Sequence, residues 1–213
     1  MASSTFELPA RGSFPTVELA KKAPKQADAL LIATFAGEEG LEVPGTSLLG
    51  SSALRSTYEA LTAVGATGKA GEIIKVPAPH KAGAAQIVAL GLGDVEALDD
   101  EALRRAAGTA ARATTGVGTV ATTLADFGIT AAVEGLILGG YAYRGIRSTE
   151  LKDEQQPATF VLVADKSASD EFEAARIVAE SVLISRDLVN TPANELYPES
   201  YACLLYTSPS PRD

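Results

Sequence analysis

The chain has few of the residues that usually bind metals or form disulfides. Its 213 residues include one cysteine, Cys203, and one histidine, His80. A single cysteine excludes an internal disulfide framework and a cysteine-based zinc site, which is consistent with a reducing compartment. A single histidine leaves no second imidazole to share a metal, and no base lies near Cys203 in sequence. The motif G-x-S-x-G is also absent, so the residues alone show no catalytic constellation.

Long hydrophobic runs and basic residues are also scarce. No apolar run approaches the roughly 20 residues needed to cross a bilayer, and the first residues, MASSTFELPARG, lack the pattern of a secretory signal. The chain has 18 Lys and Arg against 27 Asp and Glu, and its net charge of -9 disfavours nonspecific binding to nucleic acid or an anionic membrane. The basic residues form only short pairs such as Arg104–Arg105. We expect a cytoplasmic protein with neither a membrane anchor nor a nucleic-acid partner.

Six segments have the length and composition of strands. Three are apolar almost without alternation, as in strands covered on both faces: Ala29–Phe35, Ala85–Gly93 and Ala158–Ala164. Three alternate more and are predicted as flanking or edge strands: Thr16–Ala20, Glu72–Pro77 and Gly118–Leu124. Helical patterns separate them, so we predict an α/β fold with a mixed, mainly parallel sheet flanked by helices.

Three of these helical patterns lie within the predicted sheet domain. Leu98–Ala113 has acidic residues at its start and arginines later, the order that a helix macrodipole favours. Ser51–Gly65 begins with serines expected to cap it and ends at a glycine. Thr130–Gly145 is mostly apolar, and we expect neighbours on both of its sides.

The strongest helical pattern is Ser169–Asn190, which Pro192 ends. Ser169 is expected to cap it. One predicted face consists of Phe172, Ala175, Ala179, Val182 and Arg186, and a second of Ile177, Ile184 and Leu188. At 1.5 Å per residue this helix is roughly 33 Å long, which suggests a connector to another domain.

Several short motifs have both a functional and a structural interpretation. Gly91 and Gly93, between a strand and a helix, could hold an anion, but the third glycine of a dinucleotide fingerprint is missing and a tight turn is the preferred interpretation. His80 is predicted in a solvated loop. Glu38–Glu39 and Asp99–Asp100 are predicted in a loop and at a helix start, respectively. The sequence therefore assigns no catalytic, cofactor-binding or metal-ligating residue.

Three stretches together resemble the leucyl aminopeptidase (cytosol aminopeptidase) family in its bacterial form: Val88–Arg112, Ala131–Ser148 and Ser185–Ala202. The last is the most specific, because it matches the family pattern R-D-L-x-N-x-P-x-N-x-x-x-P. The matching residues are Arg186, Asp187, Leu188, Asn190, Pro192, Asn194 and Pro198. The resemblance covers most of residues 16–202.

This resemblance implies that the complete protein removes N-terminal residues, preferably leucine, from peptides. Family members use two divalent metals, manganese or zinc, held by Asp, Glu and Lys side chains of a C-terminal catalytic domain, and they form hexamers. The motifs that carry those ligands do not occur in this sequence. The resemblance also implies a macro-domain-like fold for the N-terminal part, which helps to build the hexamer. We therefore expect a chain that lacks the catalytic residues and is inactive alone.

The resemblance also divides the chain. Residues 1–165 are predicted to form the non-catalytic domain, 166–192 the connecting helix, and 193–202 the truncated start of the catalytic domain. Residues 203–213, CLLYTSPSPRD, are similar to the translation of a transposase adapter used in sequencing libraries, so we expect them to be an artefact and the natural sequence to stop at Ala202. The alternative is a natural Ser/Pro tail.

Two other functions are considered. A macro-like domain could bind a nucleotide or ADP-ribose at the loop Gly91–Asp94. A regulatory role on DNA is the second, since some relatives bind DNA, and the acidic charge balance argues against it.

Overall fold

A seven-stranded sheet forms the centre of the computed structural model, which describes residues 7–145 and 156–207. The strands are β1 (Thr16–Ala20), β2 (Ala27–Gly37), β3 (Gly40–Glu42), β4 (Ile73–Pro77), β5 (Ala84–Gly91), β6 (Thr119–Thr122) and β7 (Thr159–Val163). Their order is β1-β7-β6-β2-β5-β4, with β3 paired to β2 outside this path. β4 is antiparallel to β5 and β3 is antiparallel to β2, whereas the other pairs are parallel. The predicted mixed, mainly parallel α/β sheet is confirmed.

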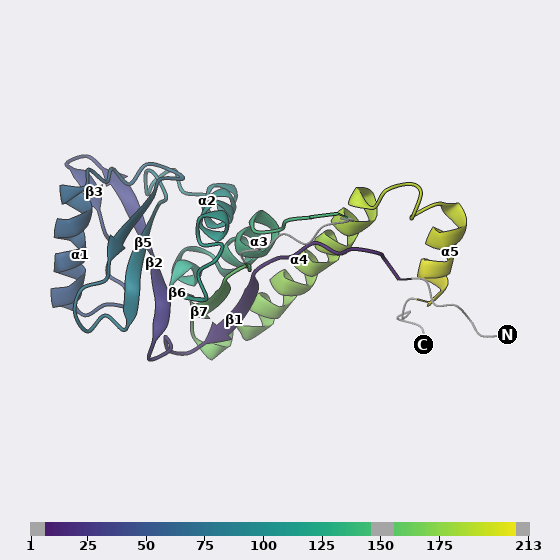
Figure 1. Cartoon of the computed structure of the whole chain (residues 1–213). Coiled ribbons are helices and arrows are strands. Elements are labelled where there is room, and N and C mark those ends of the chain that lie inside the picture. Colours follow the sequence, from purple (N-terminus) through teal and green to yellow (C-terminus); the bar gives the residue numbers. More distant parts are fainter. Residues whose placement is uncertain (1–6, 146–155, 208–213) are drawn as a thin grey trace.

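Helices cover both faces of this sheet (Figure 1). They are α1 (Ser51–Ala63), α2 (Asp100–Ala113), α3 (Ile129–Gly139), α4 (Ser169–Asn190) and α5 (Pro198–Thr207), with short 3-10 helices η1 (Leu124–Phe127) and η2 (Lys166–Ala168). The pleat of β2 divides the core, because successive side chains of a strand point to opposite faces. Leu30 and Ile32 pack with Leu61 of α1, and Leu31 packs with residues of α2 and α3 such as Leu136.

Helices α2 and α3 cross closely because both carry small residues at the crossing. A Cβ atom on Gly139 of α3 would lie 2.2 Å from Cα of Gly108 in α2. A Cβ atom on Gly135 would lie 2.4 Å from the carbonyl oxygen of Arg104. Real Cβ atoms do not approach other atoms this closely, so glycine is required at both positions of α3 for the observed packing.

The position of β6 in the sheet contradicts one prediction from the sequence. This strand was predicted as a flanking or edge strand, but it lies in the centre of the sheet between β7 and β2. Val120, Ala121 and Thr122 are all fully buried. The hydroxyl of Thr122 accepts a hydrogen bond from Leu124 N at 3.3 Å, so its burial leaves no unpaired polar group. The alternation in Gly118–Leu124 was therefore wrongly taken as the mark of a flanking or edge strand.

The two predicted serine caps are also wrong. Helices α1 and α4 begin at Ser51 and Ser169 themselves, and neither helix has a side-chain hydrogen bond at its N-cap. Ser169 has helical dihedral angles, φ -61° and ψ -43°, because η2 leads directly into α4. An N-cap residue has extended dihedral angles, so the hydroxyl of Ser169 is not placed to cap the helix. The expected glycine at the end of α1 is present, since Gly65 has φ +78°.

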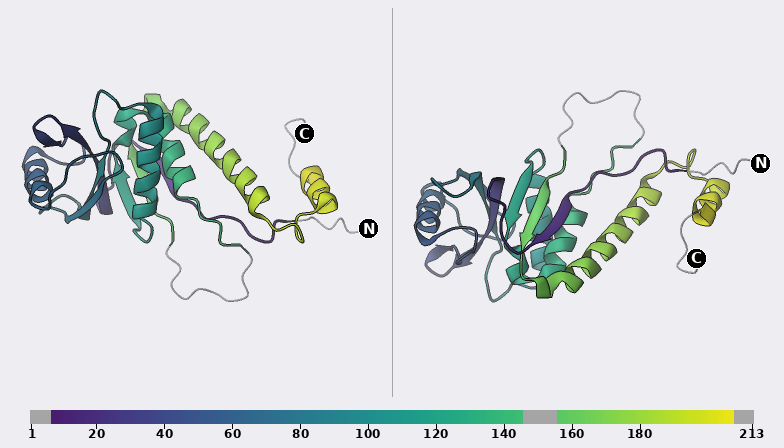
Figure 2. Two further views of the ribbon diagram at one scale, coloured as in Figure 1. Left: turned by 90° about the horizontal axis from the view of Figure 1, so that it is seen from above. Right: turned by 90° about the horizontal axis from the view of Figure 1, so that it is seen from below.

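Helix α4 has the predicted length and runs from the sheet toward α5 (Figure 2). Its buried side includes the predicted Phe172, Ala175 and Ala179, but it continues through Leu183 and Asp187 rather than Val182 and Arg186. The helical positions i, i+3, i+4 explain this path, because 172, 175, 179, 183 and 187 form one stripe. Burial of Asp187 was not expected from a charged side chain.

Other boundaries also differ from those predicted. Helix α3 ends at Gly139 rather than at Gly145, and neither β3 nor α5 was predicted. Helix α5 crosses the boundary at Ala202 that was drawn from the sequence. Residues 146–148 of the second family-like stretch and residues 208–213 of the tail lie outside the described residues.

Candidate functional site

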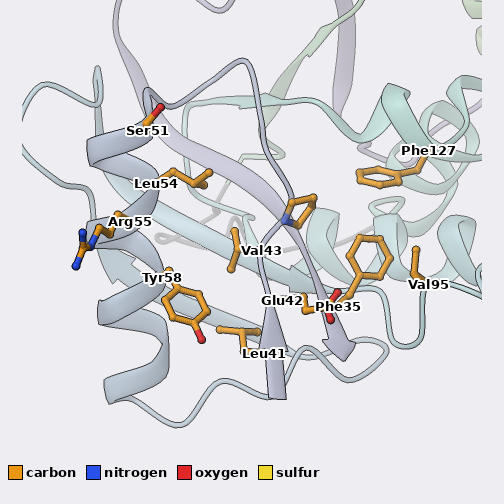
Figure 3. Close-up of a pocket in the computed structure, with 11 residues that line it drawn as sticks. Phe35, Leu41, Glu42, Val43, Ser51, Leu54, Arg55, Tyr58, Val95 and Phe127 are labelled. Atoms are coloured by element: carbon orange, nitrogen blue, oxygen red, sulfur yellow. The ribbon is translucent and has the colours of Figure 1, made fainter. Parts of the chain in front are cut away.

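A groove with a volume of about 780 Å³ opens at the carboxyl ends of the parallel strands. Phe35 lies near the end of β2, Val95 follows β5, and Phe127 ends the 3-10 helix that follows β6. Helix α1 and the β3 segment form the opposite wall (Figure 3). In open α/β sheets, ligands bind outside the carboxyl ends where the strand order reverses, and β5 and β6 lie on opposite sides of β2. This groove is therefore the first candidate for a ligand site.

The walls of this groove are mainly apolar: Phe35, Leu41, Val43, Pro44, Leu54, Tyr58, Val95 and Phe127. The rings of Phe35 and Phe127 meet edge to face, with 5.5 Å between their centroids. Arg55 is at the rim, where it forms an exposed ion pair with Glu59 at 3.1 Å, and it points away from the groove in Figure 3. The groove therefore suits an apolar group better than a phosphate or a metal.

The predicted turn at Gly91–Gly93 has a structural role. The amides of Gly91, Leu92 and Gly93 donate hydrogen bonds to the carbonyl oxygens of Glu72, Thr34 and Gly68, respectively. A Cβ atom on Gly91 would lie 2.0 Å from the carbonyl oxygen of Lys69, so the neighbouring loop occupies the space beside the turn. These three amides are therefore not available to bind an anion, and the structural interpretation of this motif is supported.

The other weighed residues are dispersed over the molecule. His80 is exposed in the turn between β4 and β5. Glu38 and Glu39 are exposed between β2 and β3. Asp99 is the N-cap of α2, where its carboxylate accepts a hydrogen bond from Ala102 N at 2.7 Å. The structure does not bring these residues together.

The residues of the most specific motif hold the end of α4 in place. Asp187 Oδ1 accepts a hydrogen bond from Gly12 N at 2.8 Å and another from the hydroxyl of Tyr141 at 2.8 Å. Asn190 Nδ2 donates to the same hydroxyl at 3.2 Å. Arg186 donates to the carbonyl oxygen of Leu138 at 2.7 Å and lies over the Tyr141 ring, 5.5 Å from its centroid. This cluster joins α4 to α3 and to the segment before β1.

Tyr141 is the centre of this cluster and was not identified from the sequence. Its partners Asp187 and Asn190 are 46 and 49 positions away, so no local spacing could indicate them. Burial is the largest cause that raises the pKa of the Tyr141 phenol above its usual 10.0, and the adjacent Asp187 carboxylate raises the pKa further, although the Asn190 hydrogen bond opposes both. The neutral phenol that donates to Asp187 is thus the favoured form.

Within residues 7–145 and 156–207, no three His, Cys, Asp or Glu side chains are close enough together to hold a metal ion. No helix in the same residues is both long and apolar enough to cross a membrane.

Comparison with known proteins gives consistent results. Residues 35–150 match the model of a protein family that is described as "Cytosol aminopeptidase family, N-terminal domain". The chain is 47% identical over 205 residues to a probable cytosol aminopeptidase of Corynebacterium diphtheriae and 44% identical over 208 residues to one of Corynebacterium glutamicum. Each match covers 95% of this chain but 41% of the relative, so the chain spans less than half the length of these curated relatives.

Solved structures share the fold. A mutant of tomato leucine aminopeptidase superimposes with a TM-score of 0.64 at 20% identity, over 91% of this chain and 43% of that one. The bottromycin maturation enzyme BotP superimposes with a TM-score of 0.63 at 24% identity, over 83% of this chain and 35% of that one. Because the match to this family covers more than half of the sequence, the chain belongs to the cytosol aminopeptidase family and carries its N-terminal domain.

Proposed function

We propose that this chain is the non-catalytic N-terminal domain and connecting helix of a metal-dependent leucyl aminopeptidase. The observation that supports this proposal is the structural role of the residues in the most specific family motif. Its residues Arg186, Asp187 and Asn190 all contact Tyr141 and anchor α4, which is a structural role. The family's catalysis then depends on the part of the relatives outside the matched 41%.

Helix α4 also presents an apolar surface away from the sheet. The exposed apolar side chains on this helix are Ile177, Val178, Val182, Ile184 and Val189. Val189, for example, is 84% exposed. Clusters of exposed apolar side chains usually mark a surface that contacts another protein or domain. We propose that the remaining part of the aminopeptidase packs against this surface, and that α4 transmits the position of one part to the other.

The family resemblance supplies the remaining elements of the proposal. The complete enzyme would act on peptides in the cytoplasm as a hexamer, with two divalent metals, manganese or zinc, that activate water and stabilise the oxyanion. One structural relative, BotP, has been solved in complex with Mn. The described residues of this chain do not fit such a metal, since they bring together no group of three suitable side chains. We therefore propose that its ligands lie in the part of the curated relatives that this chain does not match.

Activity measurements test this assignment. The purified chain, incubated with leucine p-nitroanilide and manganese, is expected to show no turnover above buffer. The full-length relative from Corynebacterium diphtheriae serves as the positive control under the same conditions. Clear hydrolysis by this chain that a chelator abolishes would refute the proposal.

A ligand-binding module is the second candidate, and the position of the groove at the strand ends favours it. Its walls are mainly apolar, and the Gly91–Gly93 amides are used in backbone hydrogen bonds, so this groove itself offers no group suited to hold a diphosphate. Calorimetry with ADP-ribose separates the two candidates. Micromolar binding would support a ligand site that is independent of peptidase chemistry, and absence of heat would support the scaffold role alone.

A further inference from the structure

A second groove, between α2 and α3, gathers four arginines in a chain whose net charge is -9. Arg104, Arg105 and Arg112 come from α2, and Arg186 comes from α4. The groove has a volume of about 530 Å³. Three of these arginines lie within the single helical pattern Leu98–Ala113, and the tertiary structure brings Arg186 to them.

Two of the four arginines are neutralised by neighbours. Arg104 forms ion pairs with Glu134 and Glu101, both at 2.7 Å. Arg105 forms an ion pair with Glu101 at 2.7 Å. These two arginines and two glutamates have no net charge, so the positive charge of the groove comes from the other pair.

Arg112 and Arg186 have no carboxylate within ion-pair distance in the described part of the chain. Arg112 donates to the carbonyl oxygen of Gly139 at 3.0 Å and to the hydroxyl of Thr109 at 3.2 Å. Arg186 donates to the carbonyl oxygen of Leu138 at 2.7 Å. The two acceptors are successive carbonyls at the C-terminal end of α3. Both guanidinium groups therefore lie at the same helix end.

Capping of α3 explains part of this arrangement but not its charge. The C-terminus of a helix carries about half a negative charge, so two guanidinium groups leave roughly 1.5 positive charges uncompensated there. Each guanidinium also has about five N–H donors, and the described hydrogen bonds of Arg112 and Arg186 use only some of them. Asp187, the acidic neighbour of Arg186, accepts instead from Gly12 and Tyr141. Donors and charge therefore remain for an anion.

We propose that the groove between α2 and α3 is a binding site for a small polyvalent oxyanion, which is held by Arg112 and Arg186. The ligand chemistry is a phosphate or a carboxylate group, because both accept paired N–H donors from guanidinium. This site is separate from the apolar groove at the strand ends. It does not depend on the proposed aminopeptidase function.

Titration calorimetry of the full chain at fixed ionic strength tests the site, with pyrophosphate and citrate as the two probes. Heat with pyrophosphate alone indicates a phosphate ligand, and heat with citrate alone indicates a carboxylate ligand. Heat with both supports a general oxyanion site. Exposed charge pairs weaken with salt, so the affinity should fall as sodium chloride is raised. No heat with either probe overturns the proposal.

Variants then locate the binding. Arg112→Gln is expected to weaken binding by about tenfold or more, since hydrogen bonds to charged groups are lost. Arg112→Lys keeps the charge, loses the planar fork, and should give an intermediate affinity. Arg55→Gln, an exposed arginine on α1, is the matched control and should bind like wild type. Circular dichroism verifies that each variant is folded, and equal binding by folded Arg112→Gln and wild type overturns the proposal.

Discussion

Replacement of Tyr141 by phenylalanine is expected to loosen the end of α4 without disturbing its packing. The change removes one hydroxyl, which donates to Asp187 Oδ1 at 2.8 Å and accepts from Asn190 Nδ2 at 3.2 Å. The aromatic ring that faces Arg186 remains. Asp187 is only 7% exposed, and it would keep a single described hydrogen bond, from Gly12 N. The variant therefore leaves a buried carboxylate less well compensated.

The size of the effect follows from the charge on the acceptor. A hydrogen bond to a charged group contributes about 1.5–3 kcal/mol. The bond from exposed Asn190 adds little, because water replaces it. We expect the free energy of unfolding to fall by about 2 kcal/mol, which corresponds to a decrease in Tm of roughly 4–8 °C for a chain of about 200 residues.

Thermal unfolding measures this change, and hydrogen exchange along α4 shows where it acts. Tyr143→Phe is the matched control, because among the described residues the buried hydroxyl of Tyr143 has no hydrogen-bond partner. Removal of this buried hydroxyl should leave stability unchanged or raise it, because a buried polar group without a partner is itself destabilising. Equal stability of the two variants, or protection of the C-terminal half of α4 that is unchanged in Tyr141→Phe, would show that the cluster does not anchor the helix.

The remaining predictions concern pH, packing and association. The pKa of the Tyr141 phenol is raised above 10.0 in the folded protein. The neutral phenol therefore stabilises the fold fully below pH 10.0, and this contribution is lost as the pH rises through the raised pKa. In alkali, wild type should lose stability more steeply than Tyr141→Phe, and parallel losses would contradict this. Burial alone would raise the pKa of the Glu72 carboxyl, but hydrogen bonds from the neighbouring loop outweigh burial and lower this pKa below 4.5. The ionised carboxylate therefore stabilises the fold above pH 4.5, and this contribution is lost as the pH falls through the lowered pKa. Acid titrations of Glu72→Gln and wild type should therefore converge at low pH, and a constant difference would contradict this. Gly139→Ala should destabilise by about 1–3 kcal/mol because its Cβ overlaps Gly108, and unchanged denaturant midpoints would disprove the close crossing. The exposed apolar side chains of α4 should cause this chain to self-associate when nothing else covers them. Ile184→Glu, at a side chain that is 57% exposed, should reduce this association in sedimentation experiments with little change in Tm, and unchanged association would argue against an α4 contact surface.

The sequence predicted the strands most reliably where burial is complete. The runs that became β2, β5 and β7 are apolar almost without alternation, because strands covered on both faces have no face that is exposed to solvent. β6 was wrongly placed at an edge because its sequence alternates, although Thr122 is fully buried and accepts a local hydrogen bond from Leu124 N. An alternation of polar and apolar residues therefore indicates a solvent-exposed face only when the polar side chains have no hydrogen-bond partner within the protein.

The motif at the end of α4 shows a different limit. Its residues were recognised from the family pattern, and their chemistry suggested no role by itself. The structure shows that Asp187 binds Gly12 across 175 positions of sequence and Tyr141 across 46. A pattern of residues along one helix cannot specify partners on other elements, because the partners are selected by the way the helices pack.

The sequence by itself determined the α/β class, six of the seven strands, and the long helix that became α4, because hydrophobic periodicity and helix-ending residues act over a few neighbouring positions. Only the tertiary structure decided which surfaces and charges meet. The glycine crossing of α2 and α3 and the placement of Arg186 beside Arg112 create a basic groove in an acidic chain. Electrostatic and hydrogen-bonding environments depend on distances in space, and the fold sets those distances between residues that are far apart in sequence.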